Sequence, residues 1–83
     1  MIDQPTARSL AIAYLDDRFP ETAGNWDVLD EDTVEAGDGW TFYWNSAEYV
    51  RTRDEGLLCY GAIPVWVGKT GVEVELRGEP EEY

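Results

Sequence analysis

Six carboxylates and no basic residue stand between residues 27 and 38. The acids are Asp27, Asp30, Glu31, Asp32, Glu35 and Asp38. One hypothesis is a negative patch that docks a basic protein and occupies its active-site cleft. The alternative is a solvated strand face, which charge repulsion keeps soluble and monomeric. The run alone leaves both interpretations open.

Two further chemistries of carboxylates are disfavoured. The run lacks the pattern of oxygen ligands and the central glycine of an EF-hand, so it does not predict a calcium site. A glycosidase-type acid–base pair needs two carboxylates across a cleft. The 18 acids create close pairs by chance, and 83 residues leave little room for a cleft. We therefore expect no catalytic residue, no metal and no cofactor.

The composition excludes other sites. The chain has no histidine and a single cysteine, which rules out Ser-His-Asp and Cys-His catalysis, an internal disulfide and a Cys-x-x-Cys site. Cys59, between Leu58 and Tyr60, is interpreted as a buried structural thiol.

The net charge of −12 predicts repulsion from nucleic acid and from anionic membranes, so the expected partner is a basic protein or peptide. No apolar run approaches the ~18 residues that span a membrane. The N-terminus also lacks the basic start and apolar stretch of a signal peptide. We expect a cytoplasmic protein.

The elements that must position these residues begin with a helix. Four tryptophans, five tyrosines and two phenylalanines predict a folded core, and nothing divides residues 1–83 into more than one domain. Ala7, Leu10, Ala11 and Tyr14 fall on one helical face, with Leu15 beside them. Asp3 or Gln4 would precede the first turn, and Pro20 would end the helix after Phe19.

Four strands follow, at about residues 27–35, 40–45, 63–67 and 72–77. The first has a polar centre, Asp30-Glu31-Asp32, that could bulge or turn. Residues 36–39 predict a hairpin turn in which Gly37, Asp38 and Gly39 supply positive φ, and residues 68–71 predict another. Trp40, Phe42 and Trp44 would share one face of their strand, as would Val72, Val74 and Leu76.

Two shorter elements complete the pattern: Ser46 could cap a short helical turn, and residues 79–83 could begin a last helix. The sum predicts an α+β fold, with one N-terminal helix packed on a four-stranded, mainly antiparallel sheet in two layers.

The same alternation places Tyr43 and Trp66 on the sheet face away from the helix. They could form an exposed aromatic platform rimmed by acids, as in a binding hot spot. Alternatively, residues 46–61 fold over that face through Tyr49, Leu57 and Leu58, and cover it.

Two blocks of the chain resemble a known family. Residues 39–46, Gly-Trp-Thr-Phe-Tyr-Trp-Asn-Ser, followed by Tyr49, resemble the Gly-Trp-x-Phe-x-x-x-Ser signature of the YrhB-type domain, also called the immunity protein 35 family. Leu58, Gly61, Pro64-Val65-Trp66-Val67, Gly71 and the closing Glu81-Glu82-Tyr83 resemble its second block and its terminus. The chain departs from the family at Ala62-Ile63, where a small polar Asn-Gly pair is usual.

This resemblance implies a small α+β domain that neutralises a bacterial toxin encoded nearby. It also leaves a second possibility, an accessory or chaperone-like module, because one relative is described as chaperone-like. Under the first, the six acids of residues 27–38 with Tyr43 and Trp66 would contact the partner.

Overall fold

The computed structural model of the protein describes residues 1–58 and 62–78. The expectations for Cys59 and for a helix at residues 79–83 lie outside the described residues. In the described part, helices and strands alternate irregularly along the chain. They are α1 (Gln4–Arg18), the 3-10 helix η1 (Pro20–Thr22), β1 (Trp26–Val28), the 3-10 helix η2 (Asp30–Asp32), β2 (Val34–Glu35), β3 (Gly39–Phe42), β4 (Trp44–Ser46), α2 (Ala47–Thr52), the 3-10 helix η3 (Glu55–Leu57), β5 (Val65–Gly68) and β6 (Val74–Leu76).

Helix α1 begins and ends where the sequence indicates. The Asp3 side chain caps it by accepting a hydrogen bond from the Thr6 N–H at 3.0 Å. The helix ends at Arg18, because Pro20 has no N–H to continue the ladder. Ala7, Ala11 and Leu15 are fully buried, which confirms the predicted apolar face.

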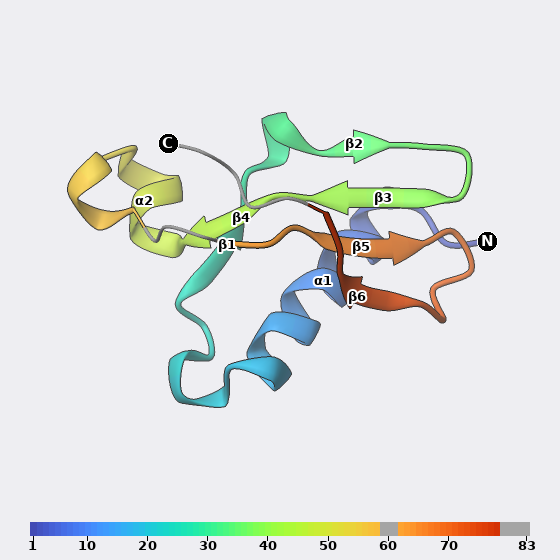
Figure 1. The fold of residues 1–83 in the computed structure, drawn as a ribbon, viewed down its shortest axis with the longest axis horizontal. Helices are drawn as coiled ribbons and strands as arrows, with labels where there is room; N and C mark the ends of the chain where they lie inside the picture. The colour runs from blue at the N-terminus through green and yellow to red at the C-terminus, as the bar shows by residue number, and fades with distance from the viewer. Residues whose placement is uncertain (59–61, 79–83) are drawn as a thin grey trace.

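The fold is α+β, as predicted. Strands β2, β3, β5 and β6 form a four-stranded antiparallel sheet in that order, and β1 pairs with β4 in a second, two-stranded antiparallel sheet. Helix α1 passes behind β5 and β6 in the view of Figure 1. Its buried side chains join one core cluster with the sheet residues Trp40, Phe42, Trp44, Val65 and Val67.

The turn that the sequence allows at the polar centre of residues 27–35 is confirmed, whereas the prediction of one continuous strand at 40–45 is wrong. Both segments are divided between the two sheets. Val28 pairs with Trp44, and Val34 pairs with Thr41. Between these two pairs the chain advances by six residues on one side of the hairpin and by only three on the other. The three extra residues are Asp30, Glu31 and Asp32, which turn outward as η2. We call them the acidic bulge. Three adjacent carboxylates favour this position, since an outward turn leaves them hydrated.

Two predictions about the hairpins are wrong: the positive φ in the first turn and the inward orientation of Val72. The turn between β2 and β3 forms, but none of Gly37, Asp38 and Gly39 has a positive φ. Val72 is 84% exposed rather than inward-facing, because it lies in the loop between Gly68 and Glu73 and not in β6. The other predicted inward residues, Val74 and Leu76, do pack on the core cluster. The Ser46 cap of α2 is confirmed, with its hydroxyl accepting from the Tyr49 N–H.

Candidate functional site

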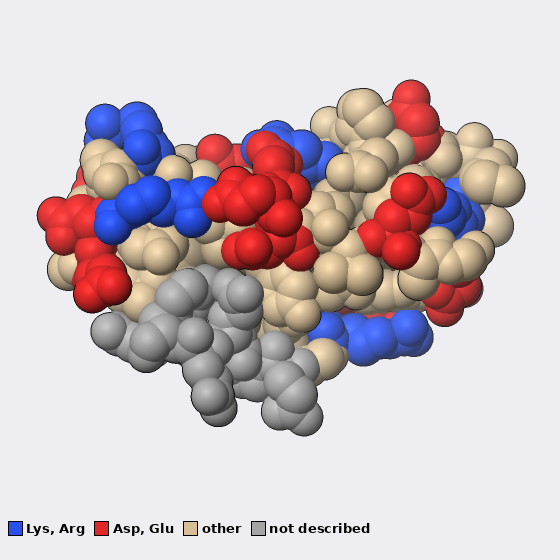
Figure 2. All heavy atoms as spheres, turned by 90° about the horizontal axis from the view of Figure 1, so that it is seen from above, with Lys and Arg blue, Asp and Glu red and all other residues tan. Residues whose placement is uncertain are grey.

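The acidic run of residues 27–38 begins on β1, beside β4, and continues through η2 and β2 along the edge of the molecule at the top of Figure 1. Figure 2 looks onto this edge from above the view of Figure 1 and shows acidic groups over it, with basic groups beside them. Asp27 is half-buried, and the other five acids are exposed. We call these six residues the acidic edge. The structure therefore exposes five of the six predicted acids.

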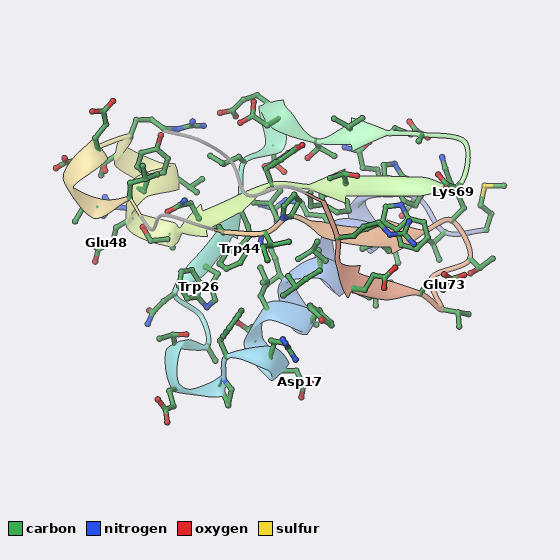
Figure 3. All side chains as sticks on the ribbon, viewed as in Figure 1. Asp17, Trp26, Trp44, Glu48, Lys69 and Glu73 are labelled. Carbon is green, nitrogen blue, oxygen red and sulfur yellow. The ribbon has the colours of Figure 1, made fainter. Side chains whose placement is uncertain are left out.

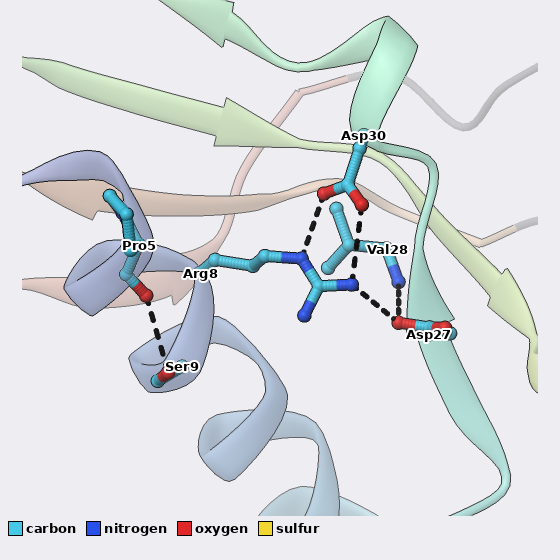
Figure 4. A network of polar contacts seen from close by, with 6 residues as sticks. All are labelled: Pro5, Arg8, Ser9, Asp27, Val28 and Asp30. Atoms are coloured by element: carbon cyan, nitrogen blue, oxygen red, sulfur yellow. Dashed lines mark hydrogen bonds and ion pairs between the residues drawn. The ribbon is translucent and has the colours of Figure 1, made fainter.

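Arg8, on helix α1, ties the first part of the acidic edge to the helix. Its guanidinium donates to Asp30 from Nε at 2.7 Å and to Asp27 from Nη2 at 2.8 Å (Figure 4). The hydrogen bond to Asp30, followed by the charges of the two carboxylates, raises the pKa of Arg8 above its ordinary value against the opposing effect of burial. Asp27 also accepts from the Val28 N–H at 2.8 Å. The bulge is thus attached to α1 through one side chain.

Two further cations pair with Glu31 and Glu35 of the edge. Arg53, which follows α2, forms an ion pair with Glu31, and Lys69, in the turn after β5, forms one with Glu35. Arg53 is held by a left-handed backbone conformation, φ 61°, in which its N–H donates to Tyr49. The acidic bulge is therefore attached on both sides, to α1 by Arg8 and to the end of α2 by Arg53.

Asp32 and Asp38 differ from the other four acids. In the described part of the chain neither carboxylate has an ion pair or a hydrogen bond. Six acids with three cations leave the acidic edge net negative. The sequence predicts a patch of negative charge here, and the structure shows that Arg8, Arg53 and Lys69 neutralise part of that charge.

The exposed aromatic platform is not formed, because Trp66 is buried, with 7% of its surface exposed. The register places it on the sheet face away from the core residue Val67, as predicted. There its ring lies against Gly39 and Gly68, and the Arg77 guanidinium lies 4.0 Å from the ring centroid. The alternation thus predicts the face correctly but cannot show what covers it.

The other members of the predicted aromatic surface lie differently. Tyr43 is half-buried, and no ring contact joins it to Trp66 among the described residues. Of the three residues expected to cover this face, Tyr49 is buried, Leu58 is half-buried and Leu57 is 39% exposed. Of the proposed contact residues, five of the six acids are exposed, whereas Trp66 is withdrawn from solvent.

An aromatic hollow at the end of α1 escapes sequence reasoning. It has a volume of about 410 Å³ and is lined by Arg18, Phe19, Pro20, Glu21, Thr22 and Trp26. Trp26 packs edge-on against Trp44, with ring centroids 4.9 Å apart, and Figure 3 shows the two side by side. The chain reverses at η1 to bring Phe19 to Trp26, and residue spacing gives no sign of that contact.

No group of three His, Cys, Asp or Glu side chains is placed to hold a metal ion within residues 1–58 and 62–78. None of the helices in the described part is long and apolar enough to cross a membrane. The chain matches no protein family, no curated protein and no solved structure with which it was compared.

Proposed function

We propose that the protein is a non-enzymatic binding domain that docks a basic protein on its acidic edge. The observation that supports this most directly is the excess of carboxylates there, including the unpaired Asp32 and Asp38. Fields of one sign speed the encounter with an oppositely charged partner more than they tighten the final complex. The four internal ion pairs, made by Arg8, Arg53 and Lys69, would hold the edge in position before the partner arrives.

The particular form that we propose is an immunity protein, acting in the cytoplasm, that occludes a bacterial toxin. The resemblance of residues 39–46 to the immunity protein signature supports this form. Occlusion needs no catalytic group, only a surface that reaches a basic cleft. The acidic bulge suits that task because its three residues project beyond the pairing of their hairpin.

A second candidate is an accessory, chaperone-like module that holds many basic or unfolded chains weakly. Exposed apolar side chains favour it: Val34 is 53% exposed and Val72 is 84% exposed. Such residues could contact varied clients without a single complementary interface.

The first test is capture of partners by the tagged full chain from its native host, over a series of salt concentrations. One basic protein at 1:1, released by salt, would support the immunity proposal. Many weakly held clients would favour the accessory module, and no basic client at all would contradict both forms.

Charge reversal then tests the surface. Asp32→Lys with Asp38→Lys should slow association with the captured protein by about tenfold or more at low salt and flatten its salt dependence. The control is Glu48→Lys with Glu73→Lys, which changes the net charge equally at exposed, unpaired acids on α2 and in the β5–β6 loop (Figure 3). If both double variants slow association equally, the effect comes from net charge, and the acidic edge has no special role in binding.

A further inference from the structure

Three aromatic rings of the described chain carry a cation that also pairs with a carboxylate. Lys69 lies 4.3 Å from the Trp40 ring centroid and pairs with Glu35. Arg77 lies 4.0 Å from that of Trp66 and pairs with Glu75. The third set consists of Tyr49, Arg53 and Glu31, with the guanidinium 5.9 Å from the ring centroid. In each set the ring and the carboxylate attract the same cation.

The aromatic hollow contains the same two components. Trp26 and Phe19 are the aromatic residues of its lining, and Glu21 is the acidic residue. Among the described residues, no cation lies over either ring, and Glu21 has no ion pair. Arg18 lines the hollow, yet it contacts neither ring as a cation and does not pair with Glu21.

The rings of the hollow are held in place before any ligand arrives. The Trp26 indole donates from Nε1 to the Thr22 hydroxyl at 3.1 Å. That hydroxyl and the Thr22 N–H both donate to the Phe19 carbonyl, at 3.2 and 3.1 Å. The connector after η1 is attached to α1 by the Gly24 N–H, which donates to Asp16 at 2.9 Å. A preorganised site loses less entropy on binding.

We propose that this hollow binds an arginine side chain of a basic protein partner. The guanidinium would stack on Trp26 and pair with Glu21, repeating the arrangement that the chain forms three times internally. An arginine suits the hollow better than a lysine, since its planar guanidinium can stack on a ring and still donate to a carboxylate. The charge of −12 favours such partners.

The hollow is separate from the acidic edge. Figure 1 places η1 and η2 on opposite sides of the molecule. This inference rests on the proposed function for the identity of the occupant, a basic protein. The binding chemistry of the hollow can nevertheless be tested without any partner.

The test is a titration with N-acetyl-arginine methylamide, followed by two-dimensional NMR of the four tryptophan indole N–H groups. The uncharged citrulline analogue is the matched probe. We expect a saturable shift of the Trp26 indole resonance with the arginine probe and a much smaller one with citrulline. Glu21→Gln should weaken binding by about two- to fivefold, as for an exposed ion pair. Glu73→Gln, at an exposed acid in the β5–β6 loop, should change nothing.

Three outcomes would overturn the proposal: equal binding of both probes, a saturable shift confined to other indoles, or no saturable shift. Binding seen only in Arg18→Gln would also overturn it, because Arg18 itself would then fill the hollow. The charge reversal of Asp32 and Asp38 should leave this titration unchanged. A negative result here and a negative result at the acidic edge are therefore distinguishable.

Discussion

Gly39 lies where the structure leaves no room for a side chain, and adding a single methyl group tests this. A Cβ at this position would lie 2.3 Å from the Val67 carbonyl oxygen and 3.0 Å from the Trp66 ring. Since one of these contacts is backbone, the β3–β5 pairing would have to shift. We expect Gly39→Ala to lower the free energy of unfolding by about 2–3 kcal/mol, measured by urea denaturation.

Gly37→Ala is the matched control, because a Cβ there meets nothing within 4 Å. Its effect should stay within about 0.5 kcal/mol. Comparable losses from both substitutions would contradict the steric role of the close contact between Gly39 and Val67.

The Asp3 cap makes the stability of α1 depend on pH. Hydrogen bonding from Thr6 lowers the pKa of Asp3 below its ordinary value of 3.8. The depressed pKa means that the cap stabilises the fold fully above pH 3.8 and loses this effect as the pH falls through the folded-state value.

Asp3→Ala should therefore reduce stability at pH 7 and have little effect near pH 2, as followed by thermal unfolding at each pH. Asp3→Asn keeps a capping oxygen that does not titrate, so its stability relative to wild type should rise as the pH falls. A constant difference between Asp3→Ala and wild type at every pH would contradict this role.

At the scale of elements, η2 depends on ion pairs with helices on both sides. Arg8→Gln removes the cation shared by Asp27 and Asp30 and leaves the two carboxylates to repel each other. We expect a loss of about 1 kcal/mol at low salt, measured by urea denaturation, since the pairs are partly exposed and charge-assisted.

Arg51→Gln removes an equal charge from an exposed arginine that forms no ion pair within residues 1–58 and 62–78. It should cost less than Arg8→Gln, and the difference should shrink as salt is added. A loss as large for Arg51 as for Arg8 would mean that net charge, rather than attachment of the bulge, accounts for the effect.

The extent of sequence prediction differs between these elements. Helix α1 was predictable because its cap, apolar face and proline are local signals. At η2 the polar residues indicate that a bulge or turn could form, but they do not give its size. The three-residue mismatch appears only when both strands of the hairpin are paired. The pairing of Arg8 with Asp27 joins residues 19 apart in sequence. Local periodicity likewise predicted the face of Trp66 but not the contact of its ring with the Arg77 guanidinium.

At the scale of the whole molecule, the excess of acids opposes folding. Eighteen acids face only six bases. Four of those bases, Arg8, Arg53, Lys69 and Arg77, already pair with carboxylates in the described part. The remaining charges repel across the fold, whose radius of gyration is 12.1 Å. This size is close to the screening length of ~10 Å at 0.1 M salt, so added salt weakens much of the repulsion.

We therefore expect sodium chloride to stabilise the protein, with a melting temperature that rises by roughly 5 °C between low and high salt, equivalent to about 1 kcal/mol. Salt also weakens the internal ion pairs, but these are fewer than the repelling acids. Glu48→Gln with Glu73→Gln should reduce the rise, because it removes two unpaired negative charges. A fall in melting temperature with salt would mean that the ion pairs outweigh the repulsion. The acidic edge would then stabilise the fold and would not need a basic partner to balance its charge.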